Sequence, residues 1–377
     1  MTNGALGPTV ITREHELTGG VKLAEARLNA ETTLNALSLE MIDGISSALS
    51  RWVADDAVAA VLLTAVGERA FSAGGDIQAL YRAMAANHQA GERVDDYPYD
   101  FFEREYRLDY ALHTCPKPLI ALGHGVIMGG GLGIFSAADF RVVTENVRIA
   151  MPEVTIGLFP DAGGTWLLRN LAEHQALFLG MTGSQVNAAD ALLSGIGTHA
   201  VARSALDDTR DGLLALELTG TPTQDRERLK TYFDGLGPMA ALPAPELPAV
   251  AEALTLGREL MDVVAAVRSL AGASSWVDRG IATMDRGCPT TVGIVVEQVR
   301  RARALELADC FRMEMTIATH CADNHDFSEG VRALIIEKDN QPRWLFVDLE
   351  SLPSGYVNDH FVEPWPVNPL SDLEDPS

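Results

Sequence analysis

Apolar and polar residues follow two different periods along the first half of the chain. Residues 58–66 (VAAVLLTAV) and residues 119–122, which follow Pro118, are short apolar runs typical of buried β-strands. Each run leads toward a glycine-rich turn. Between residues 38 and 53 apolar side chains recur every three or four positions, which predicts a helix with Ser38 as its N-cap. This alternation of strand, turn and helix predicts an α/β fold.

The pattern changes after about residue 205. Glycine turns become rarer and helical periods dominate, most clearly over residues 295–319. We therefore expect residues 206–345 to form a helical C-terminal region. Residues 346–377 contain no lysine or arginine and are rich in proline, which predicts an acidic tail that is either wrapped on the surface or disordered.

Composition narrows the class of protein. No apolar run in the 377 residues approaches the roughly 20 residues needed to cross a bilayer, so we expect no membrane-spanning segment. The formal charge of −23 repels nucleic acid, and an anionic ligand would need a local cluster of cations. The four cysteines lack paired spacing and are expected to be free thiols: Cys115, Cys288, Cys310 and Cys321. The N-terminal residues lack the features of a signal or transit peptide, and we expect a cytoplasmic enzyme.

Three glycine-rich segments carry the candidate chemistry. They are residues 69–77 (RAFSAGGDI), 123–133 (GHGVIMGGGLG) and 151–165 (MPEVTIGLFPDAGGT). The first two follow apolar strands, so their backbone N–H groups can point into one cleft, and the second begins a helix whose dipole adds positive potential. Such an arrangement suits an oxyanion.

Other chemical motifs fit the sequence less well. GGGLG does not match GxGxxG, and GxxxxGK[ST] is absent, which argues against dinucleotide and P-loop sites. Ser72 approximates a nucleophile elbow but has Ala70 where that motif requires glycine. Residues 320–326 (HCADNHD) match no standard zinc spacing, so we expect a polar helix end and no metal site.

Two acidic residues stand out in the third segment. Glu153 follows Pro152 at the mouth of an apolar stretch, and Asp161 precedes a glycine turn. Burial in one pocket would raise the pKa of at least one of these carboxyl groups, so that a glutamate could act as base or nucleophile while the second acid handles a proton or binds a hydroxyl. Asp161 could instead cap a helix that begins near Thr165, and spacing alone does not decide between these roles.

Taken together, the three segments resemble the crotonase, or enoyl-CoA hydratase/isomerase, superfamily. The resemblance implies a ββα spiral core over residues 6–205 and an oxyanion hole formed by the amides of Gly75 and Gly130. Hydratases of this family carry their first catalytic glutamate where this chain has Gly133, so the hydratase pair is incomplete.

The sequence is more similar to the 3-hydroxyisobutyryl-CoA hydrolase branch of that superfamily. IGLFPDAGG, with Asp161, is typical of the branch, as are the EYxL motif that begins at Glu105 and the distal motif at residues 325–339 (HDFSEGVRALIIEKD). The resemblance covers about residues 10–345.

This branch implies roles for the acidic residues. Glu153 either attacks the thioester carbonyl to give a mixed anhydride or activates a water for the same attack. Asp161 assists proton transfer. Glu105 binds the 3-hydroxyl group or orients water, although a solvated helix carboxylate is an equal alternative for it.

The resemblance also implies an acyl-CoA substrate and no metal or redox cofactor, since coenzyme A is part of the substrate. Arg69 takes the position that contacts the CoA phosphates, Arg332 and Lys338 are weaker candidates, and residues 28–37 resemble the segment that cradles adenine. We expect hydrolysis of a short 3-hydroxyacyl-CoA, foremost 3-hydroxyisobutyryl-CoA in valine breakdown. The alternatives are an enoyl-CoA hydratase/isomerase and a non-catalytic acyl-CoA binding protein, and homo-oligomers are compatible with each.

Overall fold

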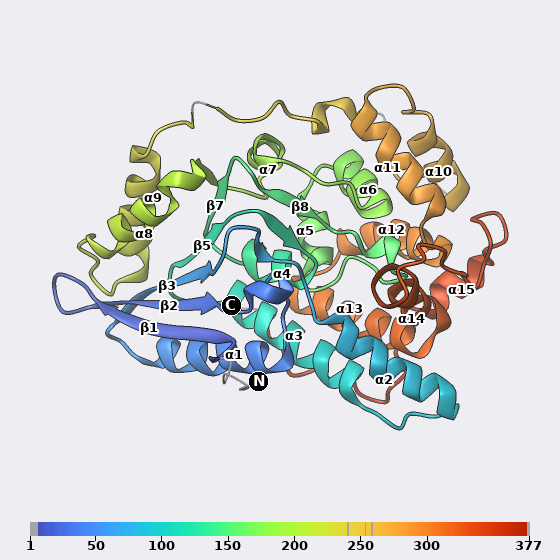
Figure 1. The fold of residues 1–377 in the computed structure, drawn as a ribbon, viewed down its shortest axis with the longest axis horizontal. Helices are drawn as coiled ribbons and strands as arrows, with labels where there is room; N and C mark the ends of the chain where they lie inside the picture. The colour runs from blue at the N-terminus through green and yellow to red at the C-terminus, as the bar shows by residue number, and fades with distance from the viewer. Residues whose placement is uncertain (1–6, 240, 253, 258, 375–377) are drawn as a thin grey trace, which may run out of the picture.

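A six-stranded sheet is the framework of the computed structural model, which describes residues 7–239, 241–252, 254–257 and 259–374. The strand order is β1-β2-β3-β5-β7-β9 (Figure 1). β1 and β2 are antiparallel, and every other neighbouring pair is parallel. The strands are β1 (Val10–Glu16), β2 (Lys22–Leu28), β3 (Val58–Ala65), β5 (Leu119–Gly123), β7 (Phe140–Thr144) and β9 (His199–Val201).

A smaller parallel sheet contains β4 (Ala70–Ser72), β6 (Val126–Met128) and β8 (Arg148–Ala150). Successive segments of the chain give one strand to each sheet, first β3 and β4, then β5 and β6, then β7 and β8, and helical residues follow each pair. The structure therefore has the ββα spiral that the sequence predicts. The predicted strands at 58–66 and 119–122 are confirmed as β3 and β5.

The helices of the first half fill the connections of this spiral. The predicted helix at residues 38–53 is α1, and the Ser38 hydroxyl accepts a hydrogen bond from the Met41 N–H as the predicted N-cap. The α-helices are α1 (Leu39–Ala54), α2 (Ile77–Ala90), α3 (Tyr97–His113), α4 (Gly130–Ser136), α5 (Gly164–Asn170), α6 (Glu173–Thr182) and α7 (Ala188–Ser194). The short 3-10 helices are η1 (Glu31–Thr33), η2 (Glu153–Thr155) and η3 (Arg203–Ala205).

The secondary-structure elements after residue 205 are all helices in the described chain, as expected for residues 206–345. The elements are α8 (Leu206–Leu214), α9 (Pro222–Gly235), η4 (Leu247–Ala249), α10 (Leu260–Arg268), α11 (Ser275–Arg286), α12 (Pro289–Ala302), α13 (Leu307–Asp323), α14 (His325–Val331), the π-helix η5 (Arg332–Ile336) and α15 (Ser354–Asp359). The helical stretch at residues 295–319 is divided between α12 and α13 by a turn at residues 303–306. No glycine or proline marks this turn, which instead lets α12 pack on α6 and α13 on α3.

The C-terminal helices share hydrophobic cores with the spiral. α8 and α9 cover one face of the large sheet, where Leu229 and Phe233 pack with Ile120 and Val142 (Figure 1). Buried residues of α10 to α14 belong to the same core as α1 and the small sheet. The helical region therefore folds onto the spiral and completes its core.

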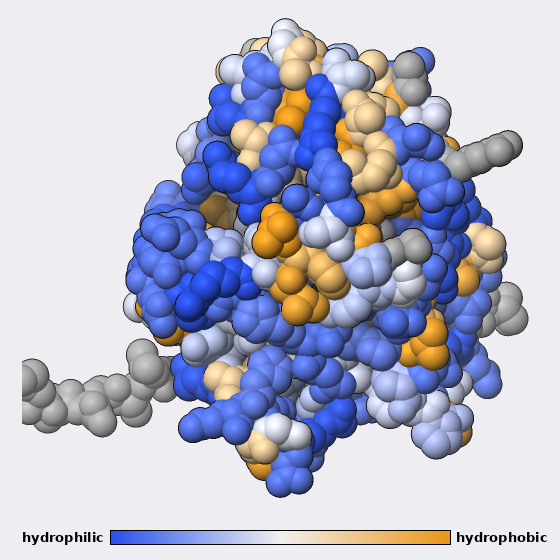
Figure 2. All heavy atoms as spheres, turned by 90° about the vertical axis from the view of Figure 1, so that its right-hand side faces the viewer, coloured by the Kyte–Doolittle hydropathy of each residue, from blue (hydrophilic) through white to orange (hydrophobic). Residues whose placement is uncertain are grey.

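The acidic tail is wrapped on the surface over its described part. Leu370 and Leu373 are buried, and Arg107 on α3 donates to Pro369 O at 2.7 Å and pairs with Asp372. The face in Figure 2 is mostly hydrophilic, with a few groups of apolar side chains. No helix in the described ranges is long and apolar enough to cross a bilayer. Cys115, Cys288 and Cys321 are free thiols, as predicted.

One buried ion pair ties α8 to the large sheet. Glu25 on β2 is buried and accepts two hydrogen bonds from the Arg210 guanidinium, at 3.0 and 2.7 Å, and one from Thr64 at 2.9 Å. His15 lies 2.8 Å from the same carboxylate. Burial raises the pKa of Glu25, but its bonds to Arg210, His15 and Thr64 outweigh burial and lower the pKa to about 2.

Glu25→Gln should lower the free energy of unfolding at pH 7 by about 1–3 kcal/mol, because it removes charge-assisted hydrogen bonds. The depressed pKa of Glu25 gives the wild type an advantage that is present above the usual pKa of 4.5 and is lost as the pH falls toward about 2. Urea unfolding across this pH range measures the difference, with the exposed Glu16→Gln as control. An equal difference at all pH values would contradict the assignment.

Candidate active site

The two predicted oxyanion turns lie side by side, because β4 and β6 are neighbouring parallel strands that end at the same edge of the small sheet. Gly74 and Gly129 have φ values of +102° and +49°, which favour glycine. A Cβ on Gly74 would lie 3.1 Å from Met128 O, so the turns are packed closely. Among the residues that the structure describes, neither the Gly75 N–H nor the Gly130 N–H donates a hydrogen bond.

Glu105 from α3 lies against these two amides. A Cβ on Gly130 would overlap Glu105 Oε1, and one on Gly75 would lie 3.9 Å from the same oxygen. The side chain is 3% exposed, and Oε1 has no hydrogen-bond partner. Burial, followed by the charges of Asp161, Glu314 and Glu153, raises the pKa of Glu105 well above its usual value. Glu105 is therefore a buried carboxyl group, and the solvated alternative is wrong.

Glu153 begins η2, which directly follows β8 and Pro152. Its Oε1 would lie 3.4 Å from a Cβ on Gly129, next to the Gly130 amide, and its Oε2 is buried without a partner. Burial and then the charge of Asp161 raise the pKa of Glu153 well above 4.5. A carboxyl group in this state is a strong base or nucleophile once it is ionised.

Asp161 lies in the same buried region and is held by Tyr106. The Tyr106 hydroxyl donates to Asp161 Oδ2 at 2.8 Å, and burial raises the pKa of Asp161 to about 7 although this bond opposes the rise. The side chain of Asp161 does not cap α5: Glu314 accepts hydrogen bonds from the N–H groups of Gly163 and Thr165, and the Gly164 N–H donates to the backbone oxygen of Asp161. Of the two roles that spacing left open for Asp161, the capping role is therefore wrong.

Three buried residues near these acids were not among the sequence candidates: Tyr106, Asp109 and Glu314. Tyr106 belongs to the EYxL motif, and Asp109 follows Glu105 by one helical turn on α3, so a helical projection could have found both. Glu314 comes from α13, far along the chain, and nothing in the local sequence connects it to Asp161.

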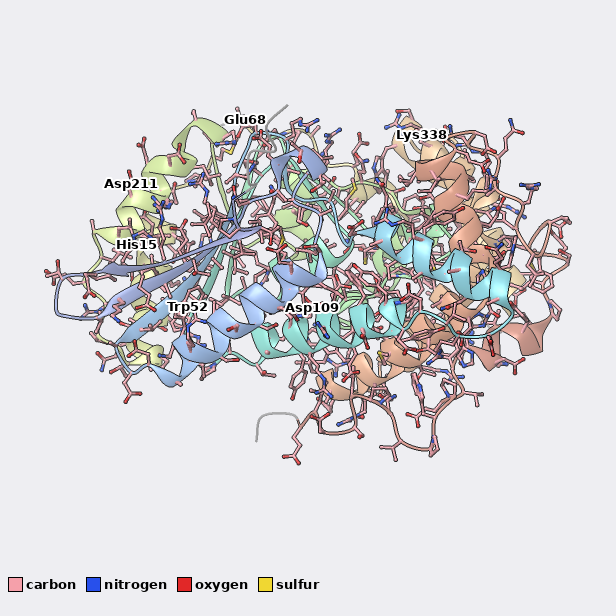
Figure 3. The ribbon with its side chains drawn as sticks, turned by 60° about the horizontal axis from the view of Figure 1, so that its bottom comes forward. His15, Trp52, Glu68, Asp109, Asp211 and Lys338 are labelled. Carbon is pink, nitrogen blue, oxygen red and sulfur yellow. The ribbon has the colours of Figure 1, made fainter. Side chains whose placement is uncertain are left out.

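Asp109, which is labelled in Figure 3, belongs to α3. It occupies space beside Gly133. A Cβ on Gly133 would overlap Ala162 O and lie 3.2 Å from Asp109 Oδ1. The absence of an acid at residue 133 thus has a steric reason, since the backbone at Ala162 closes that space. Asp109 is fully buried, neither carboxyl oxygen has a partner, and burial raises its pKa well above 3.8, with the charges of Glu105, Glu314 and Asp161 adding to the rise.

The buried carboxyl groups have no cation beside them. None of the ion pairs among the described residues involves any of the five: Glu105, Asp109, Glu153, Asp161 and Glu314. Like charges in a buried region disfavour ionisation, and so part of the cluster carries protons near neutral pH. The site can therefore both accept and supply protons.

Arg69, the first of the three predicted CoA contacts, lines an open pocket of about 420 Å³. Leu34, from the predicted adenine segment, and Arg148 line the same pocket. Arg69 and Arg148 are exposed, and neither forms an ion pair with a described residue. Arg148, the first residue of β8, was not a sequence candidate because it is an isolated charge in the sequence.

Arg332 cannot serve as a CoA contact. Its guanidinium is buried and has five hydrogen bonds, to both oxygens of Glu329, to Glu337, to Asp339 and to Gln341 O. Five N–H donors are all that an arginine side chain has, so none is left for a phosphate. Lys338, by contrast, is exposed just beyond η5 at the edge of the molecule (Figure 3).

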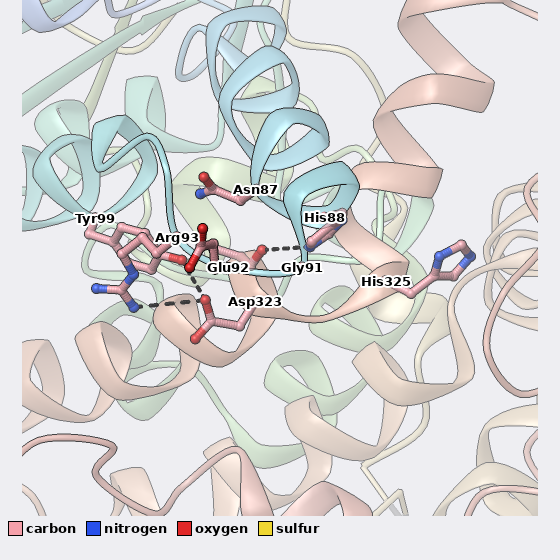
Figure 4. Close-up of a pocket in the computed structure, with 9 residues that line it drawn as sticks. Asn87, His88, Gly91, Glu92, Arg93, Tyr99, Asp323 and His325 are labelled. Carbon is pink, nitrogen blue, oxygen red and sulfur yellow. Dashed lines mark hydrogen bonds and ion pairs between the residues drawn. The ribbon is translucent and has the colours of Figure 1, made fainter.

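The motifs that the sequence analysis set aside lie outside this cluster of acids or have structural roles. The Ser72 hydroxyl is fully buried and donates to Asn35 O at 2.8 Å. Residues 320–326 form the end of α13 and the start of α14, as expected. Asp323 and His325 line a separate surface pocket, where Asp323 accepts from Tyr99 and pairs with Arg93 at 3.8 Å (Figure 4). No group of three metal-binding side chains occurs in the described part of the chain.

Asp109→Asn should stabilise the protein at pH 8 by at least about 1 kcal/mol, because each unit by which burial raises a pKa costs about 1.4 kcal/mol when the group ionises. The free energy of unfolding of the wild type falls as the pH rises above 3.8, the usual pKa of an aspartate. The stability advantage of the variant therefore shrinks toward low pH. Thermal unfolding at several pH values measures it. The exposed Asp100→Asn on the same helix should show no such gain, and a loss of stability in Asp109→Asn at pH 8 would contradict the prediction.

Comparison with known proteins identifies relatives over most of the chain. Residues 23–361 match the enoyl-CoA hydratase/isomerase family. The mitochondrial 3-hydroxyisobutyryl-CoA hydrolase of Gallus gallus is 33% identical over 338 residues, which cover 89% of this chain and 85% of that protein. The protein of the same description from Homo sapiens is 32% identical over 340 residues, which cover 89% and 84%. These relatives are described as mitochondrial, and a cytoplasmic location for this chain stays a prediction.

Solved structures agree with the fold. The crystal structure of a carnitinyl-CoA dehydratase from Mycobacterium thermoresistibile has a TM-score of 0.81 and 29% sequence identity, covering 97% of this chain and 99% of that chain. An enoyl-CoA hydratase from Rhodobacter sphaeroides has a TM-score of 0.77 and 29% identity, covering 94% and 98%. The predicted crotonase-type α/β fold with a helical C-terminal region is confirmed. The chain belongs to the enoyl-CoA hydratase/isomerase, or crotonase, family of acyl-CoA enzymes.

Proposed function

We propose that this protein hydrolyses a short 3-hydroxyacyl-CoA thioester, foremost 3-hydroxyisobutyryl-CoA, to the free acid and coenzyme A. The observation that carries the proposal is the position of Glu153: its Oε2 is buried without a partner, and its Oε1 lies beside Gly129, next along the chain to the Gly130 N–H, which donates to no described residue. Identities of 32–33% to 3-hydroxyisobutyryl-CoA hydrolases over 89% of the chain support the same reaction.

In this proposal, the thioester carbonyl oxygen accepts hydrogen bonds from the N–H groups of Gly75 and Gly130. Both donors are fixed by the backbone, so they stabilise the negative charge of the tetrahedral intermediate without reorganisation. The removal of one such donor typically costs about 3 kcal/mol of transition-state stabilisation.

Glu153 then has two routes to the same products. As nucleophile, its carboxylate forms a bond to the carbonyl carbon, the C–S bond breaks, and water later cleaves the mixed anhydride to restore Glu153. As base, it takes a proton from a water whose oxygen attacks the carbonyl carbon directly. The buried position of Glu153 and its raised pKa support either route.

Asp161 supplies the proton that the departing CoA thiolate needs. Its pKa of about 7 allows it to be protonated before the C–S bond breaks and to recover a proton from the attacking water. Glu105, whose pKa burial raises, lies beside Gly130, where it can bind the 3-hydroxyl group or orient water. Arg69, with Arg148, and the exposed Lys338 remain candidates for the CoA phosphates.

The second candidate function is hydration of an enoyl-CoA. Glu105 favours it, because this residue brings a second acid next to Gly130 although residue 133 cannot carry one. The related solved structures are described as a dehydratase and a hydratase. A binding protein without catalysis is disfavoured by the buried, unpaired Glu153.

A thiol-release assay tests the proposal directly. Purified protein should release free CoA from 3-hydroxyisobutyryl-CoA, which a disulfide reagent detects, and a small panel of acyl-CoA thioesters then ranks the acyl groups. Absence of thiol release from every thioester, together with addition of water to crotonyl-CoA, would establish the hydratase alternative instead.

Glu153→Gln should lower kcat for thiol release by about 10³-fold or more, because the amide is neither a base nor a competent nucleophile. Binding of the acyl-CoA, measured by calorimetry, should persist, since Glu153 does not contact the CoA pocket. The exposed Glu40→Gln is the control and should behave as the wild type. An unchanged kcat in Glu153→Gln would remove this residue from the mechanism.

Asp161→Asn should lower kcat by about 10²- to 10⁴-fold and also shift the pH profile. Glu153 must be ionised to act, so activity falls as the pH drops through its raised pKa. The charge of Asp161 contributes to that rise, and its removal lowers the pKa of Glu153. The acid limb of kcat/KM should therefore move to lower pH, and an unmoved limb would contradict the coupling.

A further inference from the structure

The segment that carries Asp161 is held in place by side chains from the C-terminal helices. From α12, Thr291 donates to Leu158 O at 2.6 Å, and Gln298 Nε2 donates to Pro160 O and to Thr165 Oγ1, each at 2.7 Å. α12 and α13 both pack against α5 (Figure 1). The backbone before Asp161 and the side chain of Thr165 after it are thus anchored to α12.

Glu314 from α13 completes this arrangement. Its two carboxyl oxygens accept hydrogen bonds from the backbone N–H groups of Gly163, at 2.8 Å, and Thr165, at 2.7 Å. The side chain is fully buried, and no lysine or arginine among the described residues pairs with it. A buried acid without a cation is costly to retain unless its hydrogen bonds are needed.

The turn that Glu314 binds is strained. Ala162, between Asp161 and Gly163, has a φ of +53°, a conformation that costs a residue with a side chain about 1 kcal/mol or more. Gly163 follows with a φ of +83°. A left-handed conformation at a residue with a side chain persists only when neighbouring groups hold the turn in place.

We propose that Glu314 is a positioning residue for Asp161: by binding the N–H groups of Gly163 and Thr165, it fixes the strained turn that directs the Asp161 carboxyl group toward Tyr106 and Glu153. The inference rests on the proposed function, in which Asp161 handles the proton. The C-terminal helical region is then part of the active site, because it supplies the residue that sets the geometry of the proton donor.

A carboxyl group suits this role better than an amide. Two backbone N–H donors need two acceptor oxygens, whereas glutamine offers one oxygen and one NH₂ group. In Glu314→Gln one backbone N–H would face another donor, so the turn would lose one anchor while the side-chain volume stays the same. This substitution therefore changes hydrogen bonding without opening a cavity.

Glu314→Gln should lower kcat for thiol release by about tenfold to a hundredfold, the usual effect of misplacing a reacting group by about 1 Å. KM should change by less than about threefold, because the pocket at Arg69 is built from other elements. The matched control is Glu297→Gln on α12, whose carboxylate pairs with Arg300 and Arg301, and it should keep the wild-type kcat.

Hydrogen–deuterium exchange provides a readout that does not depend on the reaction. The amides of residues 163–165 should exchange at least about tenfold faster in Glu314→Gln than in the wild type, since their acceptors are weakened. Gln298→Met, which removes the hydrogen bonds to Pro160 and Thr165, should also lower kcat. It is the second variant to measure if Glu314→Gln does not fold.

The two proposals fail in different ways. If the wild type releases no thiol from any thioester, the proposed hydrolysis is wrong, and exchange at residues 163–165 still decides whether Glu314 fixes the turn. If the wild type is active but Glu314→Gln, or Gln298→Met in its place, keeps kcat within about twofold, the positioning role of Glu314 is wrong. A rise in KM with unchanged kcat would also overturn it, because Glu314 would then act on binding.

Discussion

Two backbone N–H groups without partners, at Gly75 and Gly130, are the constraint on which this site depends. A folded protein rarely leaves such donors unpaired in its interior, because each costs about as much as a lost hydrogen bond. Here the parallel pairing of β4 and β6 brings the two turns together. Neither Glu105 Oε1 nor Glu153 Oε2 accepts a hydrogen bond from a described residue, so neither oxygen occupies these donors.

Burial raises the pKa values of the clustered carboxyl groups and so opposes their ionisation. Five carboxyl groups share a region that no cation enters, and burial is the largest cause of the raised pKa of each one. Their hydrogen bonds then set them apart: Asp161 has Tyr106, and Glu314 has two backbone N–H groups, whereas Asp109 has no partner. The same low dielectric that makes these acids costly to ionise makes an ionised Glu153 reactive.

The C-terminal helices connect stability with chemistry. α8 is tied to the sheet by the pair of Arg210 and Glu25, and α12 and α13 anchor the backbone around Asp161. Arg332, which the sequence suggested for CoA, is instead used to hold its own turn through Glu329 and Asp339. The region therefore acts on the site through backbone positions, and of the candidate cations for the CoA phosphates it contains only the exposed Lys338.

Local patterns in the sequence were sufficient for β3 and β5, for α1 and its Ser38 cap, and for the glycine turns beside Glu153 and Asp161, because period, capping and tight turns depend on near neighbours. They were not sufficient for the roles of Asp109, Glu314 and Arg332, or for the break between α12 and α13. Those features depend on contacts between segments far apart in the chain, and a residue's burial and hydrogen-bond partners exist only after those segments have packed. The sequence alone thus determined the glycine turns and the candidate acids Glu105, Glu153 and Asp161, whereas the tertiary structure added the distant acids and decided which groups are buried and which are paired, because both depend on the packing of distant segments.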